Sequence, residues 1–249
     1  TEAAKKLTKD DGSQYGLCLR NDNNQAGYYN LIYDNGGYII NDDKTKSGMD
    51  DPKTVEAMEM LEGWIKDGVL PPIETMSENG EDVLLESGKV AMVPQGSWMI
   101  AAFRDNEYTA ENCDCVELPK SATTGRRASL YNGLGWAASA NTEHPEEAWQ
   151  LIEYLGSKEA QEKQAELGVT MSAYTGTSEA WAKSANFNLQ AYINMMDDME
   201  IRPYSRSTVT WENKNSEILK SVYSGDKTMA DACKEMAEQM NESLAEEQQ

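Results

Sequence analysis

The sequence predicts an α/β fold, in which helices alternate with short strands along the chain. Apolar residues that recur every three to four positions indicate helices, and short apolar runs bounded by Gly, Pro, Asn or Asp indicate strands. The chain has 249 residues, 39% of them hydrophobic and 26% charged, so it is long enough to bury a sizeable core without disulfides or metals. Segments of the two kinds follow one another from end to end, which is typical of α/β architecture.

Capping signals predict the helices of the first half. The opening residues 1–7 read as a helix, and Gly27–Tyr33 is expected to be helical up to the turn at residues 35–37. Asp51-Pro52 starts a longer helix, because Asp is a favourable N-cap and Pro fits the first helical position. One face of that helix is apolar and is predicted to be buried: Ala57, Met58, Leu61, Trp64 and Ile65. A further short helix is expected at Glu81–Glu86.

Four short apolar runs predict strands between the helices. They span residues 15–19 (YGLCL), 89–93 (KVAMV), 115–118 (CVEL) and 134–139 (LGWAAS). Each run has the length of a buried strand rather than that of a helix.

The second half is predicted to be mainly helical. Pro145 opens a helix whose apolar residues have the spacing of a buried face, namely Ala148, Leu151, Ile152 and Leu155. Further helices are expected at residues 157–168, 179–184, 188–198, 210–223 and 228–245. In the last of these, Thr228 and Asp231 have capping-box spacing, and its apolar stripe is predicted to lie in the core: Met229, Cys233, Met236 and Met240.

The charge balance excludes one class of partner. The chain carries 22 basic and 43 acidic side chains, a formal net charge of −21. Such a surface repels phosphate backbones and anionic lipid headgroups, so no nucleic-acid partner is expected. Aromatic residues are uneven, with 12 Tyr and 6 Trp against 2 Phe. Because Tyr and Trp combine an apolar ring with a polar group, this choice favours recognition of a ligand with polar and apolar faces.

The sequence lacks the familiar signatures of metal and catalytic sites. Its cysteines are Cys18, Cys113, Cys115 and Cys233, and His144 is the single histidine. The C-x-C spacing does not fit a zinc ribbon and is too close for an easy mutual disulfide, whereas a pairing with Cys18 or Cys233 stays open. There is no P-loop, G-x-S-x-G, H-E-x-x-H or G-x-G-x-x-G. We expect no metal, no cofactor and no catalytic residue, although the abundant carboxylates leave a glycosidase pair open.

An ordered set of segments resembles a known family. Residues 86–98 (ESGKVAMVPQGSW) place a helix end, a strand and a Gly-x-Trp in quick succession. This resembles the family 1 extracellular solute-binding proteins of bacterial ABC importers, a maltose-binding-protein-like group in which such a segment presents a tryptophan at the ligand cleft. Segments 28–37, 131–149 and 203–211 resemble further parts of that family in the same order. The resemblance covers nearly the whole chain and corresponds to the C-terminal portion of the family.

The resemblance implies a periplasmic-binding-protein-like type II fold, with two α/β lobes and a cleft between them. Residues 1–132 would form the first part of the second (C-terminal) lobe, residues 133–186 the hinge crossing and a helical excursion into the first lobe, and residues 187–249 the return to the second lobe. The N-terminal sheet of the first lobe is expected to be missing. The sequence begins at Thr1, with no signal peptide and no run of about 20 apolar residues. We therefore expect a portion of a longer protein that holds half of a binding site.

The resemblance also implies a function. The expected protein is the extracytoplasmic substrate-binding component of an ABC importer, a cell-surface lipoprotein or a periplasmic protein, which binds an oligosaccharide and is not an enzyme. Its partners would be the carbohydrate and the membrane permease, and it would be monomeric. The alternatives are a carbohydrate-active enzyme such as a glycosidase, a binding protein for a non-sugar solute such as a phosphodiester or a polyamine, and a structural lobe whose tryptophans are all buried.

Sugars offer hydroxyl groups and C–H faces, which proteins meet with planar hydrogen-bonding side chains and aromatic rings. The family positions imply eight site residues: Trp98 and Trp211 as stacking platforms, Tyr28 and Tyr29 as supporting aromatics, Asn24 and Gln95 as hydrogen-bonding groups, and Asn132 and Gly133 as hinge-side contacts. For each of them a place in the core is the alternative. Arg202 and Arg206 would either meet an anionic substrate or pair with the many carboxylates.

Overall fold

The computed structural model describes residues 1–248 and separates into two compact units. Unit 1 and unit 2 each consist of more than one stretch of chain, because the chain crosses from one unit to the other after residues 95, 117, 131 and 197. Unit 1 comprises residues 1–95, residues 118–131 and the chain from Asp198 onward, and unit 2 comprises residues 96–117 and 132–197.

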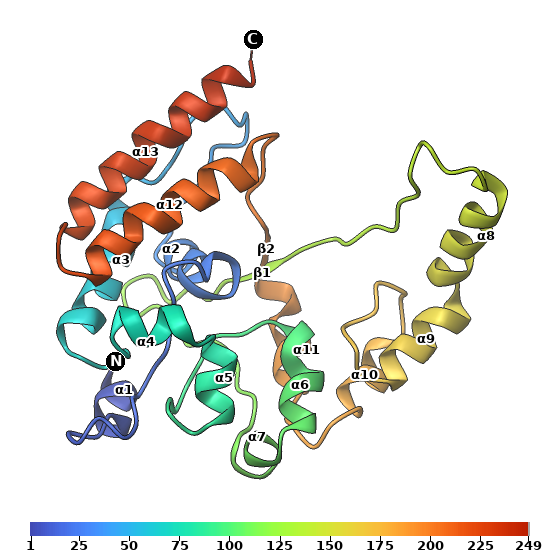
Figure 1. Ribbon diagram of the computed structural model, residues 1–249, viewed down its shortest axis with the longest axis horizontal. Coiled ribbons are helices and arrows are strands. Elements are labelled where there is room, and N and C mark those ends of the chain that lie inside the picture. The colour runs from blue at the N-terminus through green and yellow to red at the C-terminus, as the bar shows by residue number, and fades with distance from the viewer. Residues whose placement is uncertain (249) are drawn as a thin grey trace. The chain divides into compact units, whose positions relative to one another are not determined.

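Unit 1 contains the longest helices and the two strands (Figure 1). Its elements are α1 (Glu2–Leu7), the π-helical turn η1 (Asn24–Tyr28), α2 (Tyr29–Asp34), α3 (Pro52–Lys66), α4 (Ile73–Glu78), α5 (Glu81–Glu86), β1 (Ser129–Tyr131), β2 (Met199–Ile201), α12 (Thr208–Tyr223) and α13 (Met229–Glu246).

Unit 2 consists of shorter helices. In order they are the 3-10 turn η2 (Ser97–Met99), α6 (Ile100–Asp105), α7 (Glu107–Asn112), α8 (Pro145–Gly156), α9 (Lys158–Glu166), α10 (Ser178–Ala182) and α11 (Gln190–Asn194). A second 3-10 turn, η3 (Met195–Asp198), follows α11 at the crossing back to unit 1.

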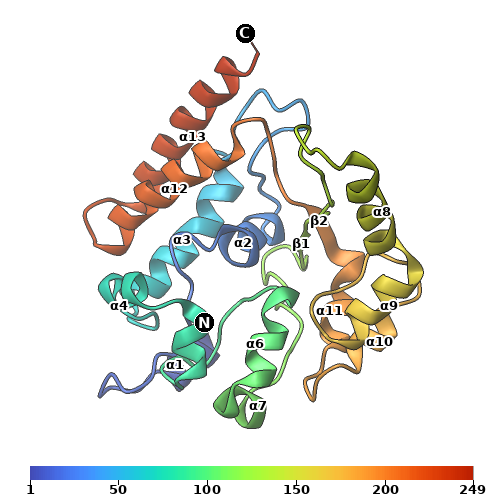
Figure 2. The ribbon, with the colours of Figure 1, turned by 45° about the vertical axis from the view of Figure 1, so that its right-hand side comes forward.

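The core of unit 1 is built on α12 and α13, which lie side by side in the two ribbon views (Figures 1 and 2) and also pack on α3. The side chain of Asp51 caps α3 by accepting a hydrogen bond from the backbone N–H of Lys53, with Pro52 at the first helical position. Thr228 caps α13 by accepting from the backbone N–H of Asp231. The predicted stripe of α13 is fully buried: Met229, Cys233, Met236 and Met240. The predicted starts of both helices are therefore confirmed. On α3, Ala57, Met58 and Leu61 are buried as predicted, whereas Trp64 and Ile65 are only half-buried.

The predicted strands are only partly present. The two strands found, β1 and β2, form a parallel pair with Ser129 opposite Met199 and Tyr131 opposite Ile201. The segment expected at residues 15–19 does run beside residues 89–92, since the backbone N–H of Cys18 donates to the carbonyl of Met92 and that of Ala91 to the carbonyl of Tyr15. However, the regular pairing is limited to one bridge, Tyr15 with Val90. These two segments are thus close partners but not full strands.

The strands predicted at residues 115–118 and 134–139 were wrong. Residues 132–139 are extended but lie outside any sheet, and Leu134 and Trp136 expose 89% and 60% of their surface. Val116 is 86% exposed. A strand needs a neighbouring backbone to complete its hydrogen bonds, and within residues 1–248 no backbone hydrogen bond joins residues 134–138 to another segment. An apolar run therefore did not suffice to define a strand.

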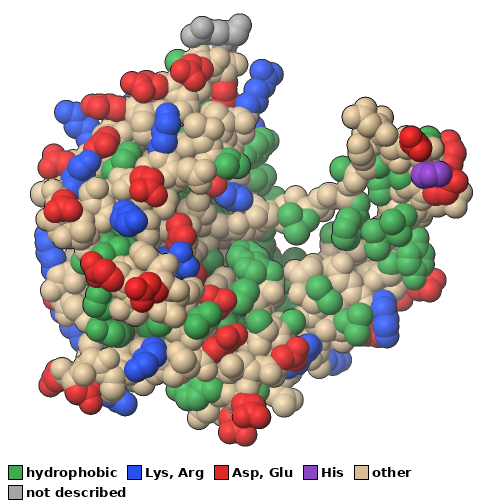
Figure 3. Space-filling model, viewed as in Figure 1, with side chains coloured by type: hydrophobic (Ala, Val, Ile, Leu, Met, Phe, Trp, Pro, Cys, Tyr) green, Lys and Arg blue, Asp and Glu red, His purple; other side chains and the backbone are tan. Residues whose placement is uncertain are grey.

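The buried face predicted for α8 was also wrong. The helix begins at Pro145 as expected, but none of its residues is buried, and Leu151 is 58% exposed. Its main packing partner is α9, the next helix along the chain. Hydrophobic side chains gather on the surface of the part of unit 2 that holds α8 and α9 (Figure 3). The amphipathic pattern is present, yet no described element covers the apolar side of the helix.

Candidate functional site

Trp98 is the predicted site residue that presents an aromatic ring to solvent. It lies in η2 of unit 2 and is 49% exposed. The ring lies against the backbone of Gly96, where a Cβ atom would come within 2.2 Å of two ring carbons. Gly96 therefore allows the ring to occupy this position, which a larger residue would obstruct. A half-exposed indole can bury one face against protein and offer surface to a ligand.

Asn24 begins the π-helical turn η1 of unit 1, between the loop at residues 20–23 and α2. Its side-chain oxygen accepts a hydrogen bond from the backbone N–H of Gln25 at 2.6 Å, and the residue is partly exposed. The turn is closed by a hydrogen bond from the backbone N–H of Tyr28 to the carbonyl of Asn23. Single π-helical turns often occur at functional sites, so this local geometry is compatible with a ligand-binding role.

Gln95 and the loop before η1 meet at one carboxylate. The side chain of Glu81 accepts hydrogen bonds at Oε1 from Asn23 Nδ2 (2.5 Å) and from Gln95 Nε2 (3.3 Å). Asn23 Nδ2 also lies 3.3 Å from the carbonyl oxygen of Pro94. Glu81 is 7% exposed, and its other oxygen, Oε2, is buried without a hydrogen-bond partner. Burial raises the pKa of Glu81 to about 7, although the hydrogen bond from Asn23 lowers it.

Sequence reasoning placed Asn24 and Gln95 at the site but missed Asn23 and Glu81. Acidic residues in the first turn of a helix are usually solvated and interact favourably with the helix dipole. The position of Glu81 at the start of a short helix therefore gave no sign that its carboxylate is buried. A sequence signal for the pairing is also missing, because Asn23 and Glu81 are 58 positions apart.

Tyr28 and Tyr29 lie in the core of unit 1, 1% and 0% exposed. Their rings are edge to face, with centroids 5.0 Å apart. The hydroxyl of Tyr29 donates to Glu212 Oε1 at 3.2 Å, and Arg202 Nη2 donates to Glu212 Oε2 at 2.5 Å. Burial raises the pKa of Tyr29 well above its ordinary value. Arg202 therefore pairs with a carboxylate, which is one of the two roles that the sequence predicts for it.

Trp211 is also fully buried in unit 1, in the first turn of α12. Its indole N–H donates to Ser205 Oγ at 3.0 Å, and that hydroxyl donates to Glu247 Oε1 at 2.7 Å. The ring therefore offers no face to solvent in this structure. A stacking role for Trp211 requires that the ring become accessible, and it stays a prediction, as do the supporting roles of Tyr28 and Tyr29.

Asn132 and Gly133 come directly after β1, where the chain crosses from unit 1 to unit 2. Both are exposed, and the position of a Cβ at Gly133 would have no atom within 4 Å. They lie at a crossing between units, as expected of hinge-side residues, and a sugar contact by either of them stays a prediction.

The described residues show no metal-binding cluster: no three His, Cys, Asp or Glu side chains gather within residues 1–248 so as to hold an ion. None of the four cysteines, all of which are described, forms a disulfide. Cys18 and Cys233 are buried, and burial raises the pKa of each thiol to about 12. Cys113 and Cys115 are half-buried. Among residues 1–248, no helix has the length and apolar character needed to cross a bilayer.

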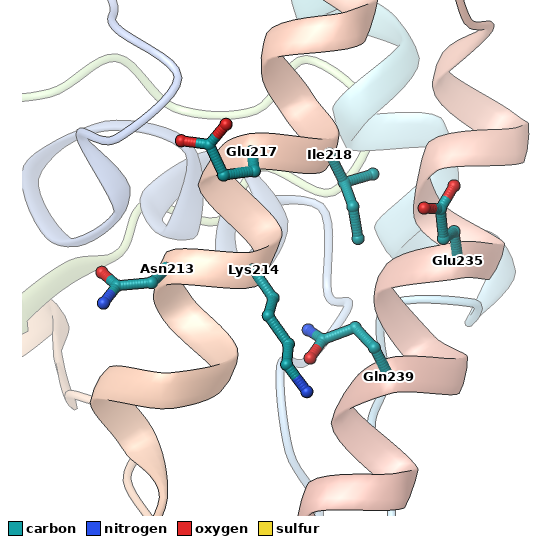
Figure 4. Close-up of a pocket in the computed structure, with 6 residues that line it drawn as sticks. All are labelled: Asn213, Lys214, Glu217, Ile218, Glu235 and Gln239. Carbon is teal, nitrogen blue, oxygen red and sulfur yellow. The ribbon is translucent and has the colours of Figure 1, made fainter.

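A groove of about 400 Å³ lies between α12 and α13, and none of the predicted site residues lines it. Figure 4 shows Lys214 and Gln239 pointing toward each other across it. Gln239 Nε2 is engaged in packing, since it donates to Asn215 Oδ1 at 2.6 Å and to the carbonyl oxygen of Trp211 at 3.2 Å. Ligand pockets are usually concave and mostly enclosed, whereas this groove is open, so we do not regard it as the functional site.

Comparison with known proteins places the chain in a family. Residues 1–196 match the sequence profile of a family described as bacterial extracellular solute-binding protein. The chain belongs to this family. The resemblance identified from the sequence is thereby confirmed, and the family is one of solute-binding proteins rather than of enzymes. A curated relative, the maltodextrin-binding protein MdxE of Bacillus subtilis, is 26% identical over 135 residues, which are 52% of this chain and 31% of that protein.

Solved structures show the same fold. The ABC substrate-binding protein Lmo0181 of Listeria monocytogenes, in complex with cycloalternan, superimposes with a TM-score of 0.84 at 20% identity, covering 98% of this chain and 62% of that one. The maltose/maltodextrin-binding domain MalE of Bdellovibrio bacteriovorus, bound to maltotriose, gives a TM-score of 0.77 at 19% identity over 98% of this chain and 65% of that one.

A solute-binding protein of Thermotoga lettingae, bound with α-D-tagatose, gives a TM-score of 0.81 at 23% identity over 98% and 63% of the two chains. The predicted type II periplasmic-binding-protein-like fold is confirmed by these likenesses. The chain spans 31% of the length of the curated relative and 62% of that of the Listeria protein.

Proposed function

We propose that the protein is the substrate-binding component of an ABC importer and that it binds an oligosaccharide. The family match over residues 1–196 carries this proposal. The relatives support the choice of ligand, since one is a maltodextrin-binding protein and solved neighbours hold cycloalternan or maltotriose. The partners are the sugar and the membrane permease of the importer. The protein acts outside the cytoplasm, at the cell surface or in the periplasm, as a monomer and without catalysis.

The chemistry of the predicted residues supports a sugar ligand. In unit 1, Asn24 and Gln95 supply amide groups that donate and accept hydrogen bonds, as ring hydroxyls require. In unit 2, Trp98 supplies a half-exposed ring for a C–H face of the sugar, and Asn132 and Gly133 add exposed groups next to the crossing after β1. The proposal includes the division into lobes. Residues 1–132 and 187–249 form the second lobe, and residues 133–186 form the hinge crossing and the helical excursion into the first lobe.

The experiment is a binding titration by calorimetry and tryptophan fluorescence on the full-length protein and on residues 1–249. The panel contains maltotriose, longer maltodextrins, cycloalternan and tagatose, with spermidine and a glycerophosphodiester as non-sugar solutes. Products are checked for hydrolysis. Trp98→Ala is expected to weaken sugar binding by about 1–3 kcal/mol, through loss of stacking. The matched control is Trp149→Ala, which removes another exposed tryptophan of unit 2, 62% exposed and outside the predicted site.

The outcomes separate the alternatives. Saturable binding of one sugar class without hydrolysis, weakened by Trp98→Ala and not by Trp149→Ala, supports the proposal. Turnover of the sugar would instead establish a glycosidase. Binding of spermidine or the phosphodiester alone would assign a non-sugar solute. If the full-length protein binds nothing in the panel, the carbohydrate proposal fails.

A further inference from the structure

A buried carboxylate connects the two segments that carry the proposed polar sugar contacts. Glu81 Oε1 accepts hydrogen bonds from the side chains of Asn23 and Gln95. Asn23 directly precedes Asn24, and Gln95 is itself a proposed contact. One carboxylate oxygen therefore holds both segments, although Asn23 and Gln95 are far apart in the sequence.

Asn23 is fixed at both its side chain and its backbone. The side-chain amide donates to Glu81, and the backbone carbonyl accepts the hydrogen bond from the N–H of Tyr28 that closes η1. Tyr28 is buried, so this end of the turn is anchored in the core. A shift of Asn23 would therefore rotate the first residue of the turn, Asn24, relative to that core.

We propose that Glu81 is a positioning residue that fixes Asn24 and Gln95 for sugar binding and thereby sets the affinity for the sugar. This inference rests on the proposed function. Because Glu81 is 7% exposed, it acts through the two amides that it holds and not through contact with the sugar.

The charge of Glu81 changes near neutral pH, which gives the proposal a distinctive signature. Burial raises its pKa to about 7. The ionisable groups that face it are Arg20 and Asp22 on the loop before η1, Cys18 on the buried segment before that loop, and Tyr223 on α12. Burial raises the pKa of Cys18 to about 12 and that of Tyr223 well above its ordinary value, so neither changes charge near pH 7.

The direction of the effect follows from hydrogen-bond strength. An ionised carboxylate is a stronger acceptor than a neutral carboxyl group, by roughly a factor of two in energy. Its bonds to Asn23 and Gln95 are therefore strongest above pH 7 and weaken when the group takes up a proton. We expect the sugar affinity to fall as the pH falls through about 7.

The test is the dissociation constant of maltotriose, measured by calorimetry on the full-length protein from about pH 5.5 to pH 8.5. The wild type is expected to lose about five- to tenfold in affinity between pH 8 and pH 6, equivalent to one charge-assisted hydrogen bond. Glu81→Gln keeps the shape but has no charge, so its affinity is expected to be low and independent of pH. The matched control is Glu86→Gln on the same helix, since no described hydrogen bond joins Glu86 to Asn23 or Gln95. It is expected to keep the wild-type profile.

A second measurement separates this inference from the proposed function. The side-chain amide resonances of Asn23 and Gln95 are followed by NMR as a function of pH without ligand. They are expected to shift with a midpoint near pH 7 in the wild type and in Glu86→Gln. In Glu81→Gln that titration should be absent.

The possible results distinguish the positioning role of Glu81 from the proposed sugar binding. Equal pH profiles of affinity in the wild type and Glu81→Gln overturn the positioning role, even if the sugar binds tightly. If no sugar binds at any pH, the proposed function fails, and the amide resonances still show whether Glu81 controls Asn23 and Gln95. Amides that do not respond to pH overturn the inference. If Glu81→Gln fails to fold, the test rests on the wild type alone. Maltotriose affinity and amide resonances that both stay constant with pH then overturn the positioning role of Glu81.

Discussion

The substitution Asp34→Asn tests how a second buried carboxyl group affects the stability of unit 1. Asp34 ends α2 and is 7% exposed, and its Oδ1 accepts a hydrogen bond from the backbone N–H of Ala128. Burial raises its pKa from 3.8 to about 7, against the opposing effects of that hydrogen bond and of Arg126 and Arg127. The unfolded chain therefore loses the Asp34 proton near pH 4, whereas the folded chain keeps it until about pH 7.

The effect of Asp34 on the free energy of unfolding follows from the difference between its pKa in the folded chain and in the unfolded chain. Protonated Asp34 favours the folded state, so its contribution is complete below about pH 4 and is lost as the pH rises through about 7. At about 1.4 kcal/mol per pKa unit, the loss amounts to about 4 kcal/mol, a large fraction of the stability of a typical domain. Asn cannot ionise, and its carbonyl oxygen can still accept the hydrogen bond from Ala128.

The assay is urea unfolding between about pH 4 and pH 9, expressed as the free energy of unfolding of Asp34→Asn minus that of the wild type. This difference is expected to move in favour of the variant by about 4 kcal/mol from pH 4 to pH 8. Subtracting the two free energies of unfolding removes the pH dependence that comes from Glu81 and from other groups present in both proteins. Asp43→Asn, at an exposed position in the loop after Ile40, serves as the control and should give a flat difference. A flat difference for Asp34→Asn as well would refute the reasoning.

Two further substitutions, Gly96→Ala and Glu247→Gln, test the packing around Trp98 and the hydrogen bonds around Trp211. Gly96→Ala places a Cβ within 2.2 Å of the Trp98 ring, so the ring should move, its fluorescence should shift, and sugar affinity should fall by about tenfold. Gly135→Ala, where a Cβ meets nothing within 4 Å, should change neither property, and equal behaviour of the two variants would contradict the packing argument. Glu247→Gln weakens the hydrogen bonds that this carboxylate accepts from Ser205, Ser207 and the backbone of Arg206; these hold its pKa at about 2. The variant should unfold about 1–2 kcal/mol more easily at pH 7. Since the pKa is lowered, the stabilisation is present above about pH 4.5 and disappears as the pH falls through about 2. A variant as stable as the wild type at pH 7 would show that Glu247 contributes nothing.

Local signals in the sequence predicted the helices well. Asp51 and Thr228 each accept a hydrogen bond from a backbone N–H at the helix start, and Pro52 fits the first helical position, so these signals act independently of the rest of the fold. The stripe of α13 was predictable because its partner α12 belongs to the same chain and covers it. Where the cause of a structure lies within one or two turns of a helix, the sequence is sufficient.

Strands and buried positions depend on distant neighbours and were less predictable. The runs at residues 115–118 and 134–139 have the composition of strands, but neither forms a strand in the part of the chain that the structure describes. Trp211 follows a polar segment, yet tertiary packing buries it completely. In the candidate site, the resemblance supplied Asn24, Gln95 and Trp98, whereas Glu81 depends on a contact between residues 58 positions apart and could be found only in three dimensions.

The distribution of unpaired cysteines provides the two units with separate chemical reporters. Cys18 and Cys233 are completely buried in unit 1, and Cys113 and Cys115 are half-buried in unit 2. A thiol reagent can reach the first pair only when unit 1 opens, because modification requires an accessible thiolate. The second pair differs, because a half-buried thiol in unit 2 is partly accessible to the reagent in the folded state. Slow labelling of Cys18 and Cys233 can therefore follow the opening of unit 1 in the protein with its natural cysteines, and faster labelling of Cys113 and Cys115 marks the folded unit 2.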